Sequence, residues 1–331
     1  MHEPIRIALS GAASPLCYSL LFRIASGAMF GIDQPVVLSL LDEPSAMPAV
    51  EATIWELDDC DFPLLRSVAA YSSPVEAFAD ANWVLLLTGA PCRKGATRAE
   101  QLRANVPLFQ QQGRAIDESA KTARVLVVAN PCNSNCLIAK STVRDLVPER
   151  WFAMTRLDQN RGKALLAHKA GVPVEQVTRV TAWGNHGPSV FLDFHNSWIG
   201  DLPAYEVIHD DAWVRNVFES GAAHRAEKLR HVRGDAPAGS TAQAVLGAVR
   251  SLASPSPINF RFSAGVVSDG SYGVPRGLVF SFPLRSEDGQ TWSIVQDLYL
   301  DGHAQDRIHA NVMELEQESV IVADVLGHSV V

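Results

Sequence analysis

The fold is decided by a stretch near the start of the chain, Ile5-Arg-Ile-Ala-Leu-Ser-Gly-Ala-Ala-Ser-Pro-Leu (residues 5–16). Residues 5–10 are mostly apolar and predict a short buried strand that ends at Gly11. Pro15 favours the start of a helix, because its fixed φ suits the first helical turn. Apolar residues at helical spacing continue to Ala25. The chain therefore begins with a strand that turns directly into a helix.

This alternation continues through the first half of the chain. Apolar strands are predicted at 36–41, 68–71, 84–87 and 124–129, and helices at 47–57 and from about 98 to 119. Strands that are nearly all apolar and alternate with helices form a parallel sheet that is covered on both faces. We therefore predict a doubly wound parallel sheet of the α/β class up to about residue 155.

The second half has a different pattern. Helices are predicted at 156–170, 210–230, 241–251 and 303–325, and antiparallel strands at 260–267, 278–283 and 291–295. This mixture predicts an α+β domain. We expect the linker to be a tight segment around residues 151–155.

Size and composition exclude several classes of protein. The chain has 331 residues, 47% of them hydrophobic and 19% charged, which is enough for two domains with a sizeable core. A net charge of −8 without a basic run argues against nucleic acid as a partner. No apolar run approaches the roughly 20 residues of a membrane span, and the N-terminus predicts a strand rather than a signal peptide. The five cysteines are scattered and odd in number, so we expect reduced thiols in the cytoplasm and no metal site.

Residues 155–186 give the strongest chemical signal. Asp158 and Arg161 are three residues apart on a predicted helix and share one face. A carboxylate there can hold a histidine, and a guanidinium beside it can bind a substrate carboxylate through two hydrogen bonds. His186 follows on a later segment, and histidine is a residue type that often serves as an acid or base in catalysis. These groups suit proton transfer on a small hydroxy or oxo acid; the alternative is a surface ion pair and a structural histidine.

The first turn is a weak candidate for a dinucleotide site. Gly11 is in place, but Ser14 stands where the next glycine is expected, so a plain strand-to-helix turn explains the pattern equally well. The start of the helix at Pro15 and Leu16 would face a pyrophosphate. Asp42, at the end of the second strand, could accept hydrogen bonds from a ribose and would repel a 2′-phosphate. The alternative for Asp42 is a turn aspartate.

Further polar candidates follow two other strands. Gly89 follows the strand at 84–87. A cationic loop, 92–98, comes next and contains Arg93 and Arg98. Asn130 follows the strand at 124–129. Ligands of open α/β sheets bind at this edge, where Arg98 could polarise a carbonyl oxygen and Asn130 could bind a substrate oxygen or the cofactor. The alternatives are a solvated basic loop and an Asn-Pro turn.

Many ordered stretches together resemble the lactate/malate dehydrogenase family, specifically its cytosolic-type malate dehydrogenase branch. The matching stretches span nearly the whole chain: Tyr18-Ser-Leu-Leu-Phe-Arg-Ile-Ala, Met29-Phe-Gly-Ile-Asp-Gln-Pro, Glu56-Leu-Asp-Asp-Cys-Asp-Phe-Pro-Leu-Leu, Asn130-Pro-Cys-Asn-Ser-Asn, Met154-Thr-Arg-Leu-Asp-Gln-Asn-Arg, Ala182-Trp-Gly-Asn-His and Tyr272-Gly-Val-Pro-Arg-Gly. The resemblance implies a Rossmann-type NAD-binding domain at 1–155 and a substrate-binding catalytic domain at 156–331. It also implies hydride transfer between NAD and the 2-position of a 2-hydroxy or 2-oxo acid, usually in a homodimer.

The resemblance also implies a role for each candidate residue. His186 resembles the catalytic acid/base and Asp158 its partner, while Arg161 resembles the residue that binds the C1 carboxylate. The remaining residues carried over are Arg98 for the reacting carbonyl, Asn130 for substrate and cofactor, and Asp42 for selection of NAD.

Four departures from the family pattern lie around the substrate and the cofactor phosphates. Cys92 stands where malate enzymes have the arginine that binds the distal carboxylate of oxaloacetate, and Gly187-Pro188 replaces Ser-Ser after the histidine. Ser14 replaces a glycine, and the serine-rich stretch that lines the substrate pocket in the family reads Asp235-Ala-Pro-Ala-Gly-Ser. We therefore expect an NAD-dependent 2-hydroxyacid dehydrogenase with altered specificity, for instance in a specialised biosynthetic pathway. Two alternatives stay open: an ordinary malate dehydrogenase that uses Arg93, and a non-catalytic nucleotide-binding homologue.

Overall fold

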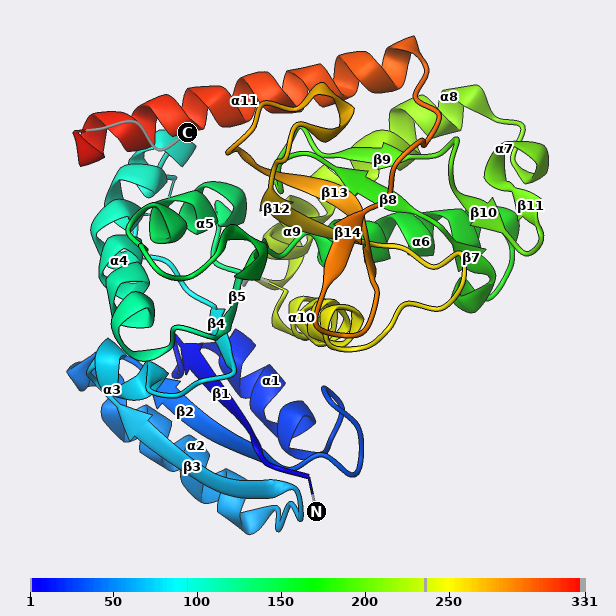
Figure 1. The fold of residues 1–331 in the computed structure, drawn as a ribbon. Coiled ribbons are helices and arrows are strands. Elements are labelled where there is room, and N and C mark those ends of the chain that lie inside the picture. The colour runs from blue at the N-terminus through cyan, green and yellow to red at the C-terminus, as the bar shows by residue number, and fades with distance from the viewer. Residues whose placement is uncertain (1, 94, 235–236, 328–331) are drawn as a thin grey trace.

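One nine-stranded sheet runs through the whole molecule. The computed structural model describes residues 2–93, 95–234 and 237–327 (Figure 1). The order of strands in the sheet is β14-β13-β12-β6-β5-β4-β1-β2-β3. Six of them pair in parallel: β1 (Ile5–Ser10), β2 (Val36–Leu41), β3 (Leu65–Tyr71), β4 (Trp83–Leu86), β5 (Arg124–Val127) and β6 (Trp151–Ala153). This order confirms the predicted doubly wound parallel sheet.

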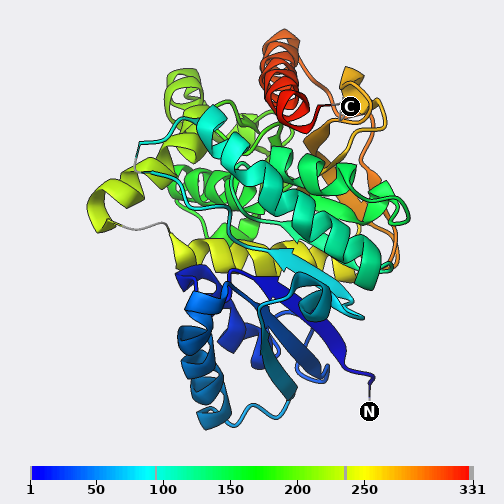
Figure 2. The ribbon, with the colours of Figure 1, turned by 90° about the vertical axis from the view of Figure 1, so that its left-hand side faces the viewer.

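Helices cover both faces of this sheet. Alternate residues of β1 face opposite sides, so Leu9 belongs to one apolar core and Ala8 to the other. The helices over the Leu9 face are α1 (Pro15–Ala25), α2 (Met47–Asp59) and α10 (Ala238–Ala253). The helices over the Ala8 face are α3 (Pro74–Phe78), α4 (Arg98–Ser119) and α5 (Cys132–Ser141). Figure 2 shows α10 in yellow, lying against the blue N-terminal part.

The second half extends the sheet and adds a smaller core. Strands β12 (Phe262–Val267), β13 (Val279–Ser286) and β14 (Trp292–Ile294) are antiparallel, as predicted, and β12 pairs with β6. A separate core surrounds Leu166 and Phe218. Its elements and their neighbours are α6 (Arg156–Ala170), β7 (Val177–Thr178), β8 (Thr181–Trp183), β9 (Phe191–Asp193), β10 (Trp198–Ile199), β11 (Leu202–Pro203), α7 (Ala204–Val207), α8 (Asp211–Trp213), a π-helical turn (Val214–Phe218) and α9 (Glu219–Arg233).

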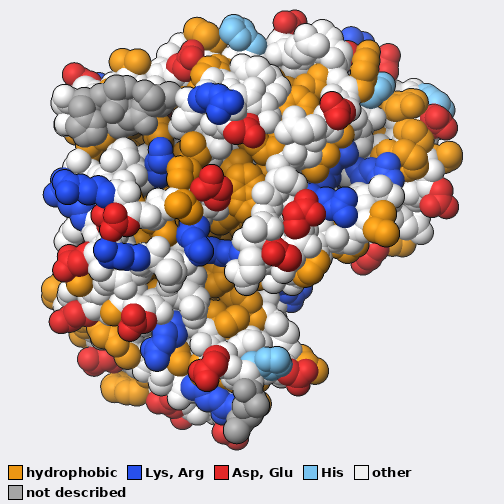
Figure 3. Space-filling model, viewed as in Figure 1, with side chains coloured by type: hydrophobic (Ala, Val, Ile, Leu, Met, Phe, Trp, Pro, Cys, Tyr) orange, Lys and Arg blue, Asp and Glu red, His pale blue; other side chains and the backbone are white. Residues whose placement is uncertain are grey.

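The C-terminal helix α11 (Gly302–Leu326) lies across the outside of α4 and α5 (Figure 1). Within the described ranges, no helix is long and apolar enough to cross a membrane. On the face shown in Figure 3, acidic and basic side chains are interspersed, without an extended area of one charge.

Two predicted features differ in the structure. The linker expected around 151–155 contains β6, a fully buried strand in the middle of the sheet, which is too short to show a recognisable pattern in the sequence. The single helix expected at 210–230 is divided into α8, the π-helical turn and α9. The predicted division into domains after residue 155 falls between β6 and α6 and stays a prediction.

Candidate functional site

The proposed acid/base pair is assembled by the start of α6 and the loop after β8. Asp158 lies in the first turn of α6 and is 1% exposed. Its Oδ2 lies 2.5 Å from Nδ1 of His186. The backbone N–H of His186 also donates to Oδ1 of the buried Asn133, at 3.0 Å. His186 is therefore held by hydrogen bonds to both its ring and its backbone.

The close approach of α11 to this loop requires a glycine. Gly184 has a φ of +93°, and a Cβ on it would lie 2.1 Å from Oδ1 of Asn311. The same oxygen accepts a hydrogen bond from the backbone N–H of Asn185 at 2.8 Å. Any side chain at 184 would displace the segment that carries His186.

Arg161 lies beside the pair with hydrogen-bonding capacity left over. Its Nη1 donates to Oδ1 of Asp158 at 3.3 Å and to the carbonyl of Ala222 at 2.9 Å. Its Nη2 is buried without a hydrogen-bond partner. Burial lowers the pKa of this guanidinium, an effect that Asp158 opposes. A buried cationic donor without a partner is costly unless a ligand satisfies it, and a carboxylate would do so.

Arg98 is held by α11 next to the loop that carries His186. It is the first residue of α4, whose N-terminus is capped by Thr97. Its Nη2 donates to Oδ1 of Asn185 at 3.1 Å, and its Nε contacts the buried carboxylate of Glu318. A Cβ on Gly187 would lie 3.2 Å from Nη1 of Arg98. The structure therefore brings Arg98 to both neighbours of His186, with its charge balanced by Glu318.

Cys92 and Arg93 are not part of this cluster. Both are exposed on the loop before α4. Arg93 forms an ion pair with Glu100 at 2.7 Å, and its side chain is 70% exposed. Glu100 belongs to the cap of α4, where the backbone of Thr97 and then Arg93 lower the pKa of its carboxyl group. The guanidinium of Arg93 is thus paired with a surface residue of α4 and does not contact His186, Asp158 or Arg161 in any hydrogen bond or ion pair found among the described residues.

The cofactor candidates meet at the carboxyl end of β1 and β2. Gly11 has a φ of +70°, and a Cβ on it would lie 2.1 Å from Oγ1 of Thr88, so only glycine fits there. Oδ2 of Asp42 accepts a hydrogen bond from the backbone N–H of Ala13 at 2.8 Å. The Ser14 hydroxyl accepts one from the N–H of Cys17 at 3.2 Å and caps α1. Pro15 opens that helix, so the replacement of a glycine by Ser14 leaves the strand–turn–helix geometry intact.

Gly89 and Asn130 are joined by an asparagine that sequence reasoning missed. Asn105 is fully buried in α4, and its Oδ1 accepts the backbone N–H of Ala90 at 2.8 Å. Its Nδ2 donates to the carbonyl of Asn130 and to Oδ1 of Asn135, both at 3.1 Å. A Cβ on Gly89 would lie 2.7 Å from the same Oδ1. Asn130 itself is exposed at the edge of the sheet.

Other supporting residues also escaped sequence reasoning. They are Asn133, Asn185, Asn311 and Glu318, all buried polar residues. The sequence alone does not show whether a single polar residue in a helix is buried. A polar residue at a position where helical spacing predicts an apolar one is a weak signal of burial. Among the described residues, no group of three or more His, Cys, Asp or Glu side chains could hold a metal ion.

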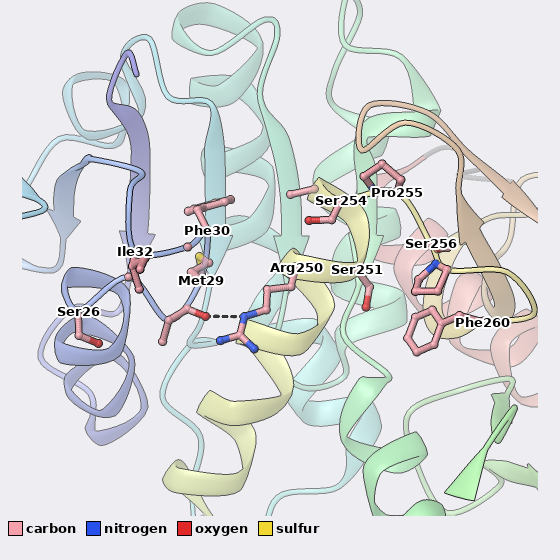
Figure 4. Close-up of a pocket in the computed structure, with 15 residues that line it drawn as sticks. Ser26, Met29, Phe30, Ile32, Arg250, Ser251, Ser254, Pro255, Ser256 and Phe260 are labelled. Atoms are coloured by element: carbon pink, nitrogen blue, oxygen red, sulfur yellow. Dashed lines mark hydrogen bonds between the residues drawn. The ribbon is translucent and has the colours of Figure 1, made fainter. Parts of the chain in front are cut away.

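A separate cavity lies elsewhere in the molecule (Figure 4). It has a volume of about 710 Å³ and is lined by the loop after α1 and the end of α10. Nε of Arg250 donates to the carbonyl of Ala28 at 2.5 Å across it. The loop after α1 leads into the start of β2, so this cavity lies near the amino end of that strand. The candidate residues Gly11, Asp42 and Asn130 follow the carboxyl ends of their strands instead. It does not contribute to the cluster described above.

Comparisons with known proteins identify the family. Residues 5–151 match the lactate/malate dehydrogenase NAD-binding domain, and residues 155–323 match the lactate/malate dehydrogenase α/β C-terminal domain. The chain belongs to the lactate/malate dehydrogenase family. It is 43% identical to a malate dehydrogenase of Magnetococcus marinus over 326 residues, which cover 98% of this chain and 99% of that protein.

Two solved members of the lactate/malate dehydrogenase family agree with this assignment. The crystal structure of malate dehydrogenase from Naegleria fowleri is 35% identical, with a TM-score of 0.94. Trichomonas vaginalis lactate dehydrogenase in complex with NADH and oxamate is 30% identical, with a TM-score of 0.92. Both comparisons cover 98% of this chain and 99% of the other. The chain is thus an NAD-dependent oxidoreductase that acts on the hydroxyl group of a 2-hydroxy acid.

Proposed function

We propose that this enzyme interconverts a 2-oxo acid and a 2-hydroxy acid with His186 as the acid/base, and that oxaloacetate is not its best substrate. The observation that carries the catalytic part is the 2.5 Å contact between His186 and the buried Asp158, beside the unpaired Nη2 of Arg161. A proton donor with an oriented partner and a free anion-binding group together match the requirements of carbonyl reduction.

Each residue of the cluster has a separate task in the proposed reaction. The turn at Gly11 and Asp42 would hold NADH, which would provide the hydride for reduction. His186, as an imidazolium, donates a proton to the oxygen on C2, and Asp158 stabilises its charge. Arg161 holds the C1 carboxylate and so fixes the orientation of the substrate.

Arg98 and Asn130 complete the proposed site at its open side. Arg98 would stabilise negative charge on the reacting oxygen once loop 90–98 closes over the substrate and excludes water. In the structure its Nε contacts Glu318, so closure must move this guanidinium away from α11. Asn130 lies at the end of β5 and would contact both the substrate and the cofactor.

The proposed specificity rests on the start of the loop. Cys92 is uncharged, so it offers no partner to a distal carboxylate at the position where malate enzymes of the family carry an arginine. The alternative, that Arg93 takes this role, would require Arg93 to leave its ion pair with Glu100. A changed substrate fits a specialised biosynthetic pathway better than central metabolism. A non-catalytic homologue would have no use for the buried pair of Asp158 and His186.

We also propose a homodimer that works in the cytoplasm. Trp55 on α2 and Tyr18 on α1 are 65% and 44% exposed, and the Tyr18 hydroxyl donates to Glu56 at 2.6 Å. These two helices therefore carry large apolar side chains on one adjoining surface, which suits burial against a second copy. All five cysteines are free thiols, as a reducing compartment requires.

A panel of 2-oxo acids tests the proposal. NADH oxidation is measured with pyruvate, oxaloacetate and longer 2-oxo acids, for the unmodified enzyme and for His186→Gln. We expect turnover of at least one acid other than oxaloacetate, and a loss of about 10²- to 10⁴-fold in His186→Gln. Unchanged turnover in the variant would disprove the catalytic assignment. Oxaloacetate as the best substrate, with Arg93→Ala abolishing its reduction, would identify an ordinary malate dehydrogenase.

A further inference from the structure

Arg225 lies on α9, the helix that contacts Arg161, and has no role in the function proposed so far. Nη1 of Arg161 donates to the carbonyl of Ala222, in α9, at 2.9 Å. One residue earlier, a Cβ on Gly221 would lie 2.7 Å from Leu165 of α6. This side of α9 therefore packs against α6 at Arg161. Arg225 follows Ala222 by three residues, so it projects from the same side of the helix, one turn further on.

Arg225 is close enough for its charge to act on Arg161. Besides burial, the positive charge of Arg225 lowers the pKa of Arg161. Arg161 is buried, whereas Arg225 is exposed to solvent. Two positive charges are thus neighbours, one on the buried Arg161 and one on the exposed Arg225.

The charges around His186 leave room for more than one negative group. In the described part of the chain, Asp158 is the only carboxylate that forms an ion pair with Arg161, and it also binds His186. Arg98 is balanced separately by Glu318 and Glu314. Asp158 therefore balances only one of three positive charges when His186 is protonated: Arg161, Arg225 and the imidazolium. A substrate with two anionic groups would restore the balance.

We propose that Arg225 is a specificity-determining residue that binds a second anionic group, such as a carboxylate, on the side chain of the 2-oxo acid. This inference rests on the function proposed above and narrows its substrate class. The second anionic group would be bound from α9, and not from the loop that begins at Cys92. The substrate is then a 2-oxo acid whose distal charge is placed differently from the one that a loop arginine would select.

Matched substrates isolate the contribution of charge. Oxaloacetate, 2-oxoglutarate and 2-oxoadipate carry a distal carboxylate. Their partners of the same lengths, 2-oxobutyrate, 2-oxovalerate and 2-oxohexanoate, keep the C1 carboxylate but have a neutral side chain, and are called the neutral acids below. We expect the unmodified enzyme to prefer the charged member of at least one pair. Arg225→Ala should lower kcat/KM for that diacid by about 30- to 1,000-fold, as for the loss of a charge-paired contact. The matching neutral acid should change less than about threefold.

Two further variants separate specificity from damage to the fold. Arg225→Lys keeps the charge and should recover part of the diacid activity. Arg215→Ala removes an exposed arginine from the π-helical turn before α9 and should leave both substrates unaffected. As a readout without turnover, quenching of bound NADH fluorescence should show weaker binding of hydroxymalonate, a dicarboxylate, to Arg225→Ala, and unchanged binding of oxamate, a monocarboxylate.

The outcomes also separate this inference from the proposed function. A preference for the neutral acid in every pair, or an equal effect of Arg225→Ala on both members of a pair, would overturn the role of Arg225 while leaving His186 as the acid/base. Full turnover in His186→Gln would instead overturn the proposed function itself.

Discussion

Asp158 contacts both of the residues to which we assign the main chemical roles in the site, His186 and Arg161. One of its oxygens contacts His186 and the other contacts Arg161, and the whole side chain is buried. A buried carboxylate is stable when its oxygens accept charge-assisted hydrogen bonds, which both partners provide. His186 and Arg161, the proposed proton donor and anion-binding group, are consequently held in one geometry by a single side chain.

We expect Asp158→Asn to lower kcat by about 10²- to 10⁴-fold, because the amide keeps the shape but cannot stabilise the imidazolium. NADH affinity, measured by fluorescence, should stay within about twofold, since the proposed cofactor residues Gly11 and Asp42 follow β1 and β2. Asp210→Asn is the matched control, because this exposed aspartate pairs with Lys169 on the surface. Normal kcat in Asp158→Asn would contradict the shared role of this carboxylate.

Cys92 allows a charge to be added to the folded enzyme chemically. Cys60 and Cys92 are exposed, whereas Cys17, Cys132 and Cys136 are buried. Burial, and then the charge of Asp158, raises the pKa of Cys132 to about 12, so this thiol stays protonated and unreactive at pH 8. In a Cys60→Ser background, 2-bromoethylamine should therefore convert Cys92 alone into a cationic side chain.

We expect this conversion to raise kcat/KM for oxaloacetate by about tenfold or more, as one new contact to a carboxylate would. Iodoacetamide, which adds a neutral group at the same sulfur, is the control and should give no gain. Mass spectrometry verifies the labelled site. Equal effects of the two reagents would show that the start of the loop does not face the substrate.

The sequence was sufficient to predict the residues whose chemistry is local. Asp158 and Arg161 share a helical face, and the structure places them in contact. Asn105 could not be predicted in this way, because its partners Ala90, Asn130 and Asn135 come together only when α4 packs against the ends of β4 and β5. Arg225 was missed for the same reason, since its proximity to Arg161 depends on the packing of α9 against α6.

At the scale of elements, α11 acts on the site from outside the sheet. Glu318, on α11, accepts hydrogen bonds from Arg98 and Ser134 and from Nδ2 of Asn185, the last at 2.9 Å. These donors belong to α4, to α5 and to the loop before His186. One carboxylate thereby joins three elements and holds Arg98 beside the loop that carries His186.

We expect Glu318→Ala to destabilise the fold by roughly 2–4 kcal/mol, because three donors lose a charged acceptor at once. The melting temperature and the urea midpoint should both fall. Gln317→Ala, at the neighbouring exposed position, is the control and should change neither. A Glu318→Ala variant as stable as Gln317→Ala would show that this carboxylate does not tie the elements together.

Elements were predictable where their apolar pattern is long. The bounds of β2 and α6 agree with the sequence pattern, and the predicted strands at 260–267 and 278–283 overlap β12 and β13. β6 was missed because three consecutive buried residues are too few to show the alternation of a strand. The break in the helix predicted at 210–230 was missed because a π-helical turn has no clear sequence signature.

At the scale of the whole molecule, assembly is the property that most needs measurement. The proposed dimer would bury the exposed indole of Trp55 on α2. We expect light scattering to show a dimer at micromolar concentration and Trp55→Glu to shift it towards the monomer, because a buried unpaired charge is costly. Val320→Glu changes a similarly exposed residue on α11 and should leave the dimer intact. A monomeric unmodified protein would refute the proposal.

The pairing of β6 with both β5 and β12 makes the two halves of the chain dependent on each other for solubility. At this seam a Cβ on Gly265 would lie only 2.7 Å from Cβ of Ala153, so the two halves are in direct backbone contact. A gene truncated after residue 155 would encode a sheet with an open, fully apolar edge, and such edges promote aggregation. The N-terminal half is therefore not a portable module, and we expect it to be recovered in soluble form only when residues 156–331 are produced alongside it.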